Sequence, residues 1–132
     1  MTNLWEKYAK VLVEYSTNVQ KGELTVISAS SPQATPLIRE IYKLVLQKGA
    51  YPVIRCGLEG MTETYLKYAE DDQLSYIDPM LQVEYEKAQN FISLGAPFNT
   101  KSLAKADSKK LAKLSAATKK LSELMLSRAA KV

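Results

Sequence analysis

The chain has 132 residues, of which 46% are hydrophobic and 24% are charged, a balance typical of one soluble globular domain. It contains no histidine and one cysteine, which excludes Ser-His and Cys-His catalytic pairs and nearly every zinc site. The net charge of +4 is uneven, because residues 1–100 carry nine basic and twelve acidic side chains whereas residues 101–132 carry nine and two.

The apolar segments are short. The longest ones, near residues 25–29 and 44–46, are far below the ~20 residues that a membrane span requires. The N-terminal segment lacks the basic and apolar regions of a secretory signal, and a lone Cys56 cannot form an internal disulfide. We therefore expect a cytoplasmic protein with no membrane partner.

The first predicted element is an amphipathic helix. Asn3 and Glu6 have the spacing of a capping box, and Gly22 is expected to end the helix. We expect Tyr8 and Tyr15 to pack in the core with their hydroxyls at its rim. The apolar side chains at helical spacing are Leu4, Tyr8, Val11, Leu12, Tyr15 and Val19.

Two predicted strands flank a second helix. Residues 24–29 and 52–56 are short and rich in β-branched side chains, and turn residues bound them, which indicates buried parallel strands. The start of the helix between them is left open, because Ser31-Pro32 and Thr35-Pro36 both have the pattern of a cap and a first turn. The apolar face of this helix comprises Leu37, Ile38, Ile41, Leu44 and Val45.

The rest of the chain predicts short helices, a third strand and a long basic helix. Thr62 and the Asp78-Pro79 pair are expected to begin two short helices, and residues 90–95 read as a strand. In the second short helix, Leu81, Tyr85 and Ala88 are expected to face inward. One long amphipathic helix is expected from residue 102 to the end, with lysines opposite an apolar arc of Leu103, Leu111, Leu114, Leu121 and Met125.

This alternation predicts an α/β fold, with a three-layer architecture in which helices cover both faces of a parallel sheet of at least three strands in the order 2-1-3. The chain, residues 1–132, is expected to form a single α/β domain at the N-terminus of a larger protein, because such sheets usually have more strands. A fourth strand should follow where Arg128, Lys131 and Val132 end the sequence. The strand residues expected inside are Leu24, Val26, Ile27, Val53, Ile54, Phe91, Ile92 and Leu94.

The chemistry-bearing residues give no strong motif. Ser28, Ser30 and Ser31 follow the first strand, where open α/β sheets bind ligands, but their loop has no glycine for a phosphate, so helix capping is the preferred interpretation. The run from Glu70 to Asp72, with Asp78 nearby, is interpreted as a solvated loop with one capping aspartate.

Two strand residues and the basic helix are the remaining candidate sites. Cys56 is interpreted as a small core residue, and the neighbouring Arg55 must find a carboxylate or the edge of the sheet. The basic C-terminal helix has no interleaved aromatic residues, which disfavours a nucleic-acid partner. We assign no catalytic, cofactor-binding or metal-binding residue.

Residues 76–121, with the segments at 4–30 and 47–54, resemble the N-terminal domain of the thermophilic metallo-aminopeptidases of the aminopeptidase T and leucyl aminopeptidase type. The strand followed by Asn99, Thr100, Lys101, Ser102 and Leu103 is the most distinctive part of this likeness. The resemblance implies an exopeptidase that removes N-terminal residues from peptides. Two divalent metal ions, zinc or cobalt, would activate water and polarise the carbonyl in a C-terminal domain that this chain lacks.

The resemblance implies that this chain is a non-catalytic domain, inactive alone, which helps to wall the substrate cavity or the dimer. The alternative is a stand-alone α/β interaction or ligand-binding module. We also expect a homo-oligomer, with the edge strand at 90–95 or the helix at 102–131 at its centre, because that strand has no charge or proline to discourage pairing.

Overall fold

The computed structural model describes residues 4–95, 108–127 and 131. The chain forms two compact units. The first comprises residues 1–58, 87–96 and 130–132, and the second comprises residues 59–86 and 97–129.

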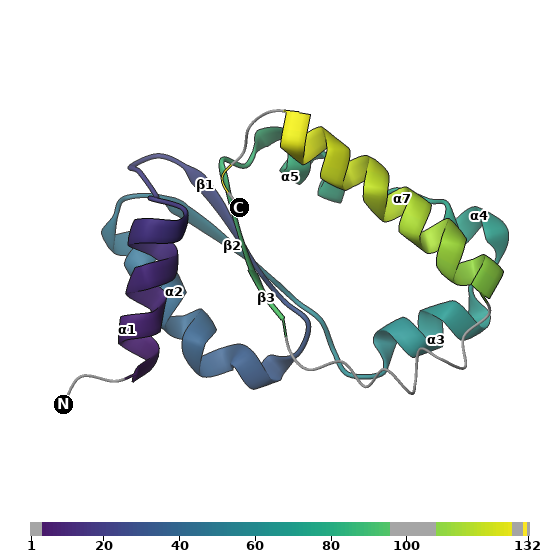
Figure 1. The fold of residues 1–132 in the computed structure, drawn as a ribbon, viewed down its shortest axis with the longest axis horizontal. Coiled ribbons are helices and arrows are strands. Elements are labelled where there is room, and N and C mark those ends of the chain that lie inside the picture. The colour runs from purple at the N-terminus through teal and green to yellow at the C-terminus, as the bar shows by residue number, and fades with distance from the viewer. Residues whose placement is uncertain (1–3, 96–107, 128–130, 132) are drawn as a thin grey trace. The chain divides into compact units, whose positions relative to one another are not determined.

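The first unit is built on a three-stranded parallel sheet (Figure 1). Strands β1 (Leu24–Ala29), β2 (Tyr51–Cys56) and β3 (Asn90–Leu94) lie in the order β2-β1-β3. Both neighbours run parallel to β1, and Ile27 lies opposite Ile54 on β2 and Ile92 on β3. The predicted α/β class, the three strands and the order 2-1-3 are therefore confirmed.

The N-terminal helix is shorter than expected and changes its winding. Helix α1 (Leu4–Lys10) continues as the π-helix η1 (Val11–Ser16), and the Thr17 N–H donates to the Leu12 carbonyl five residues earlier at 3.2 Å. The helix thus ends six residues before Gly22, the residue expected to end it. The capping box predicted at Asn3 lies outside the described residues.

The buried side of α1 and η1 differs from the predicted one. Ala9, Val13 and Thr17 are buried, and Leu12 packs only partly against the core. Tyr8 and Tyr15 are 51% and 80% exposed, so the expectation that they pack in the core is wrong. Small side chains let the helix approach the core closely, and the larger apolar residues therefore face away from it.

The two possible starts of the second helix, Ser31-Pro32 and Thr35-Pro36, are both used. A 3-10 turn, η2 (Pro32–Ala34), begins after Ser31, whose Oγ accepts from the Gln33 N–H at 3.2 Å. Helix α2 (Thr35–Gln47) then starts with a proline in its first turn, a position that needs no backbone donor. Its predicted apolar face is buried, and Figure 1 shows α2 and α1 beside the sheet on the same side.

Burial in the sheet follows strand position more than side-chain type. Val26, Ile27, Phe91 and Ile92 are buried as expected. Ile54 is 45% exposed, so its predicted burial is wrong, because β2 is an edge strand. The remaining residues expected inside, Leu24, Val53 and Leu94, are half-buried.

Lys131 continues the sheet beyond β3 by a single residue. It forms a parallel bridge with Asn90, in which the Phe91 N–H donates to the Lys131 carbonyl at 2.8 Å. The Lys131 N–H donates to the Gln89 carbonyl at 2.9 Å. This is the position at which the sequence predicted a fourth strand.

The second unit is helical where the structure describes it. It contains α3 (Met61–Tyr68), α4 (Asp71–Leu74), the larger part of α5 (Pro79–Lys87) and α7 (Ser108–Ser127). The start of α5 is confirmed, whereas α3 is preceded by Gly60 in a left-handed conformation and not capped by Thr62 as expected. A glycine reaches this conformation without strain, which explains why the helix begins there.

The apolar arc of the basic helix is confirmed in part. Leu111 and Leu114 pack against buried Leu66, Ala69 and Leu74, and Leu121 on the same helix is buried. Leu103 and residues 102–107 lie outside the described residues. In the second short helix region, Leu81 and Tyr85 are half-buried and Ala88 is fully buried.

None of the helices described by the structure combines the length and the hydropathy that crossing a membrane would require.

The central strand should be far more sensitive to truncation than its edge neighbour. Ile27 is fully buried and faces the half-exposed Ile54 in register. We expect Ile27→Ala to lower the free energy of unfolding by about 2–5 kcal/mol, and the matched Ile54→Ala to lower it by less than about 1.5 kcal/mol, because only the first leaves a core cavity. Urea titrations followed by circular dichroism measure both. Equal losses would contradict the assignment of β2 as an edge.

Candidate functional site

The carboxyl ends of the strands bring together one pair of hydroxyl groups. Ser28 on β1 lies opposite Ser93 on β3, and the Ser28 hydroxyl donates to Ser93 Oγ at 3.2 Å. Ser31 instead caps the 3-10 turn, which confirms helix capping as its role. Ser93 was not predicted as a candidate residue, because only the register of the third strand against the first places it opposite Ser28.

The end of β2 is held close to the end of β1 through Gly57. Its N–H donates to the Ala29 carbonyl at 2.8 Å. A Cβ on residue 57 would lie 2.8 Å from the Ser30 carbonyl oxygen, a distance that real Cβ atoms essentially never show. Glycine is therefore required here by close approach of the backbone, not by a bound phosphate.

The last residues of β2 are surface residues. Cys56 is exposed, so the interpretation of it as a core residue is wrong, because one side of the edge strand faces solvent. Its Sγ lies 3.5 Å from the carbonyl oxygen of Gly57. Arg55 is also exposed on this edge strand, which was one of the two environments expected for its charge.

The acidic residues of the second unit stabilise helices. A carboxylate oxygen of Asp71 lies 2.6 Å from Lys113 Nζ, and Asp78 Oδ1 accepts from the Met80 N–H at 2.9 Å. Glu70 forms a capping box with Gln73, whose side chain accepts from the Glu70 N–H at 2.8 Å. The predicted capping aspartate is confirmed at Asp78, whereas the solvated loop expected at residues 70–72 is wrong, because Glu70 caps the short helix α4, which contains Asp71 and Asp72.

The described residues offer no metal centre. No three His, Cys, Asp or Glu side chains cluster among residues 4–95, 108–127 and 131. The whole sequence has no histidine, and its single thiol is isolated. This donor set does not fit a dinuclear hydrolytic site.

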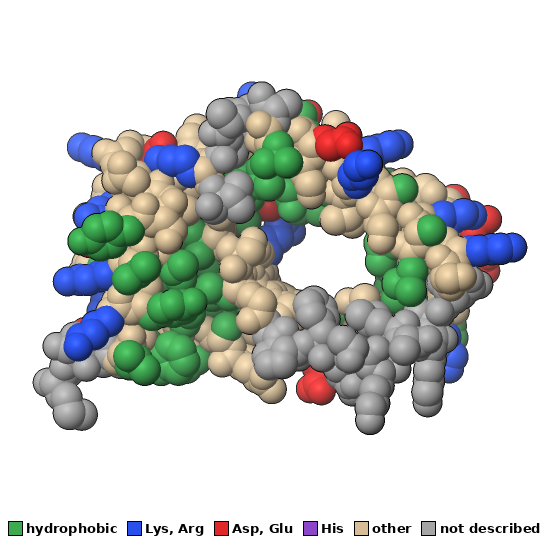
Figure 2. Space-filling view, in the orientation of Figure 1, with side chains coloured by type: hydrophobic (Ala, Val, Ile, Leu, Met, Phe, Trp, Pro, Cys, Tyr) green, Lys and Arg blue, Asp and Glu red, His purple; other side chains and the backbone are tan. Residues whose placement is uncertain are grey.

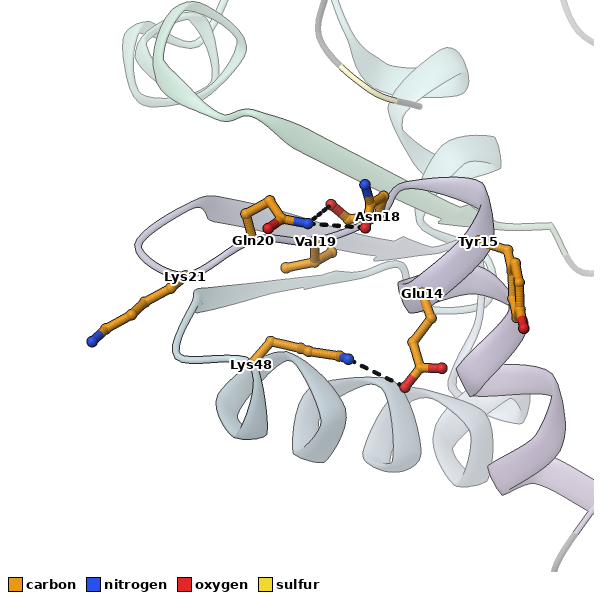
Figure 3. Close-up of a pocket in the computed structure, with 7 residues that line it drawn as sticks. All are labelled: Glu14, Tyr15, Asn18, Val19, Gln20, Lys21 and Lys48. Carbon is orange, nitrogen blue, oxygen red and sulfur yellow. Dashed lines mark hydrogen bonds and ion pairs between the residues drawn. The ribbon is translucent and has the colours of Figure 1, made fainter.

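A surface cavity of about 490 Å³ lies at the opposite, amino end of the sheet (Figure 3). Its walls come from the end of η1 and from the turns that precede β1 and β2. Lys48 Nζ lies 3.3 Å from Glu14 Oε1, so these two charges largely offset each other. The lining residues are Glu14, Tyr15, Asn18, Val19, Gln20, Lys21 and Lys48.

Two similar turns create this cavity, which the sequence analysis did not predict. Each has a lysine followed by a glycine, Gly22 or Gly49, in a left-handed conformation. The Gly22 N–H donates to the Gly49 carbonyl at 2.9 Å, which places the turns side by side. The repeated Lys-Gly pair before each strand was visible in the sequence, but its spatial pairing was not.

A buried polar cluster ties the loop before β1 to β3 and Lys131. The amide of the fully buried Asn90 donates to Glu23 Oε1 at 3.1 Å and to Thr25 Oγ1 at 3.0 Å. Glu23 Oε1 also accepts from the Gln20 N–H at 2.8 Å and from Lys131 Nζ at 2.9 Å. The cluster therefore joins three segments that are far apart in the sequence.

Opposing influences act on the pKa of Glu23. Burial alone raises the pKa of this carboxyl, but hydrogen bonds from the Gln20 N–H, Lys131 and Asn90, with the charge of Lys131, lower it below its usual value. The carboxylate form thus stabilises the folded chain at neutral pH. This stability is present above the unfolded-state pKa and is lost as the pH falls through the lowered folded-state pKa.

Replacing the Glu23 carboxylate should therefore have a pH-dependent effect. We expect Glu23→Gln to lower the free energy of unfolding at pH 7 by about 1–3 kcal/mol, because charge-assisted hydrogen bonds are lost. The difference from the parent chain should shrink as the pH falls below the unfolded-state value of about 4.5, and it should disappear only below the lowered folded-state pKa, where the folded parent carboxyl is itself protonated. Urea titrations at pH 7 and pH 3 measure it. The exposed Glu86→Gln serves as the control, and a pH-independent loss would contradict the assigned cluster.

The close approach at Gly57 predicts a second effect on stability. Gly57→Ala should lower the free energy of unfolding by about 1–3 kcal/mol, since the new methyl group meets the Ser30 carbonyl. Gly95→Ala is the matched control, because no described atom lies within 4 Å of its Cβ position. Thermal unfolding of both variants compares them. A neutral Gly57→Ala would show that the ends of β1 and β2 are further apart.

Comparison with known proteins identifies the family. The family model described as thermophilic metalloprotease (M29) matches residues 1–132. A solved structure, wild-type AmpT from Thermus thermophilus, has the same fold with a TM-score of 0.67 and 17% sequence identity over 92% of this chain. The chain spans 32% of the length of that protein, and a search of curated proteins found no significant match. Because the family model covers all 132 residues, the chain belongs to the M29 family of thermophilic metalloproteases.

Proposed function

We propose that this chain is the non-catalytic N-terminal domain of a metal-dependent aminopeptidase that removes N-terminal residues from peptides. Membership of the M29 family supports the peptidase activity of the whole protein. The single observation that carries the non-catalytic role is the donor set, which has no histidine and one isolated thiol in 132 residues. The metal ions of the enzyme, zinc or cobalt, would then be held by the part of the protein beyond this domain.

Three sets of polar groups that could otherwise serve a metal or a peptide have structural partners, which supports this division of roles. Asp71 pairs with Lys113, Glu23 pairs with Lys131, and the Ser28 hydroxyl bonds to Ser93. Recruiting these groups to a metal or a peptide would break contacts that stabilise the fold. We propose that the domain helps to wall the substrate cavity or the dimer, and that the peptide is cleaved elsewhere.

The proposal also covers the location of the protein and its partners. We propose that it is cytoplasmic, that copies of the chain self-associate, and that neither a membrane nor a nucleic acid is its partner. Two of the five lysines of α7 support the last point, because Lys113 is paired with Asp71 and Lys110 Nζ donates to the Lys67 carbonyl at 3.2 Å. Such lysines are occupied by their own unit instead of forming a phosphate-binding row.

A stand-alone α/β ligand-binding module is the second candidate function. The cavity at the amino end of the sheet favours it, because its lining includes the polar residues Tyr15, Asn18 and Gln20, although the Lys21 side chain points away from the other lining residues (Figure 3). The cavity is exposed and its other cation, Lys48, is paired with Glu14. One solvent-exposed cavity is therefore the support for this candidate, whereas the family match over residues 1–132 supports the aminopeptidase domain.

Metal binding and hydrolysis test the main proposal. Purified residues 1–132 should show no saturable zinc or cobalt binding at low micromolar concentration by calorimetry, because no imidazole is available. They should release no leucine from a chromogenic leucine anilide in the presence of either metal. The positive control is an M29 enzyme with its catalytic domain. Metal-dependent hydrolysis by residues 1–132 alone would overturn the proposal.

A further inference from the structure

Three polar side chains lie in register across the carboxyl half of the sheet. Ser28 on the central strand β1 has Arg55 of β2 as its partner on one side and Ser93 of β3 on the other. We name these three residues the polar row. Register partners share one face of a sheet, and the hydrogen bond from Ser28 to Ser93 Oγ agrees with this. Neighbouring strands lie about 4.8 Å apart, so the polar row is about 10 Å wide.

The polar row lies on the side of the sheet away from the N-terminal helices. Side chains alternate along a strand, and Ile27, next to Ser28, belongs to the core cluster that includes residues of α1, η1 and α2. Figure 2 shows hydrophobic side chains gathered over the region of α1, a surface with little to offer a charged ligand. Within the polar row, Arg55 and Ser93 are exposed and Ser28 is half-buried.

The polar row coincides with the point at which the strand order reverses. The chain runs from β1 through α2 to β2, and it then returns to place β3 on the other side of β1. Open parallel sheets bind ligands at the carboxyl ends of the strands beside such a point. Ser28, Arg55 and Ser93 are each the last residue but one of their strand. The row therefore has the position that a ligand site needs.

The polar row offers hydrogen-bond donors and one positive charge. The Ser28 hydroxyl donates to Ser93 Oγ at 3.2 Å, so Ser93 keeps its own hydroxyl proton for another acceptor, and no described residue accepts it. Arg55 already makes a contact within the chain, but its guanidinium has five N–H donors and a permanent charge. It can therefore hold an anion beside that contact.

A carboxylate fits the polar row better than a phosphate does. The planar fork of one guanidinium matches the two oxygens of a carboxylate, and one positive charge balances one negative charge. Phosphate sites gather successive backbone N–H groups in turns. At the end of β2 the Gly57 N–H donates to the Ala29 carbonyl, so this backbone donor serves the fold instead.

We propose that the polar row binds the C-terminal carboxylate of a peptide, with Arg55 as its ion-pair partner and Ser93 as a second donor. The bond between Ser28 and Ser93 is kept on binding. The proposal rests on the function proposed above, in which the domain helps to wall the substrate cavity, and it names the group of the substrate that the domain holds. An exopeptidase acting at the N-terminus meets every kind of side chain, whereas the C-terminal carboxylate is a charge that all of its unmodified peptides share.

Titration of isotope-labelled residues 1–132 with short peptides, followed by nuclear magnetic resonance, tests the proposal. Acetyl-leucyl-alanine, whose only charge is its C-terminal carboxylate, should shift the amide signals of the polar row with a Kd of about 1–10 mM at low salt, because an exposed ion pair is weak. The same peptide with a C-terminal amide should bind at least about tenfold more weakly, since it lacks the negative charge.

Variants of the polar row separate its charge from its geometry. Arg55→Gln should weaken binding of acetyl-leucyl-alanine by about tenfold, and Arg55→Lys, which keeps the charge without the fork, by about threefold. Ser93→Ala should weaken it by about threefold, since one donor is lost. Arg39→Gln is the matched control, because Arg39 is equally an exposed arginine but lies on α2, and binding should not change. Unfolding curves check that each variant keeps its fold.

The remaining arms identify the ligand. Equal binding of the C-terminal amide, or equal weakening by Arg39→Gln and Arg55→Gln, would overturn the proposal. Equal binding of acetyl-glutamyl-alanine amide, whose only carboxylate is a side chain, would overturn the assignment to the C-terminus. Tighter binding of inorganic phosphate at the same residues would overturn the choice of a carboxylate. None of these measurements involves a metal ion or hydrolysis, so their failure is distinguishable from failure of the proposed non-catalytic role.

Discussion

Pairing of β1 on both of its edges is the interaction on which the rest of the structure depends. Every residue from Leu24 to Ala29 has a partner in β2, and those from Thr25 onward also have one in β3. Parallel pairing forces the chain to cross over between strands, and α2 makes the first crossover. Because β1 has a strand on each side, its Ile27 is fully buried. It lies in one core cluster with residues of the N-terminal helix (α1 and η1) and of α2. The outer strands have only one partner strand among the described elements, apart from the bridge at Lys131.

The two ends of this sheet are organised by different physical devices. At the carboxyl end, backbone contact dominates, since Gly57 lies against the end of β1 with no room for a side chain. At the amino end, two left-handed glycine turns bond to each other and a half-buried carboxylate, Glu23, accepts three hydrogen bonds. Neither end assembles a nucleophile with a base. The described contacts at both ends stabilise the sheet, which supports the proposal that metal-assisted hydrolysis belongs to another part of the protein.

The N-terminal helix has two apolar sides, and only one of them is buried in the core. Two apolar sets run along it, one of small residues around Ala9 and Val13 and one of large residues around Tyr8 and Tyr15. The small set contacts the core, because close approach of the helix gains more packing than bulky side chains would allow. The large set is then left on the exposed side of the helix. Across the π-helix η1 the buried side continues, since Val13 and Thr17 are both buried.

The sequence by itself determined the strands, their order, the caps at Ser31 and Asp78, and the absence of imidazole chemistry, because these depend on local composition, short-range hydrogen bonds and connection handedness. Tertiary structure alone decided which apolar face of the first helix is buried, that Ile54 and Cys56 lie on an exposed edge, and that two distant turns form a cavity. Periodicity shows that a face is apolar, but burial depends on which surface comes to lie against it. That choice is made by packing between segments distant in the chain, for which a single sequence carries no local signature.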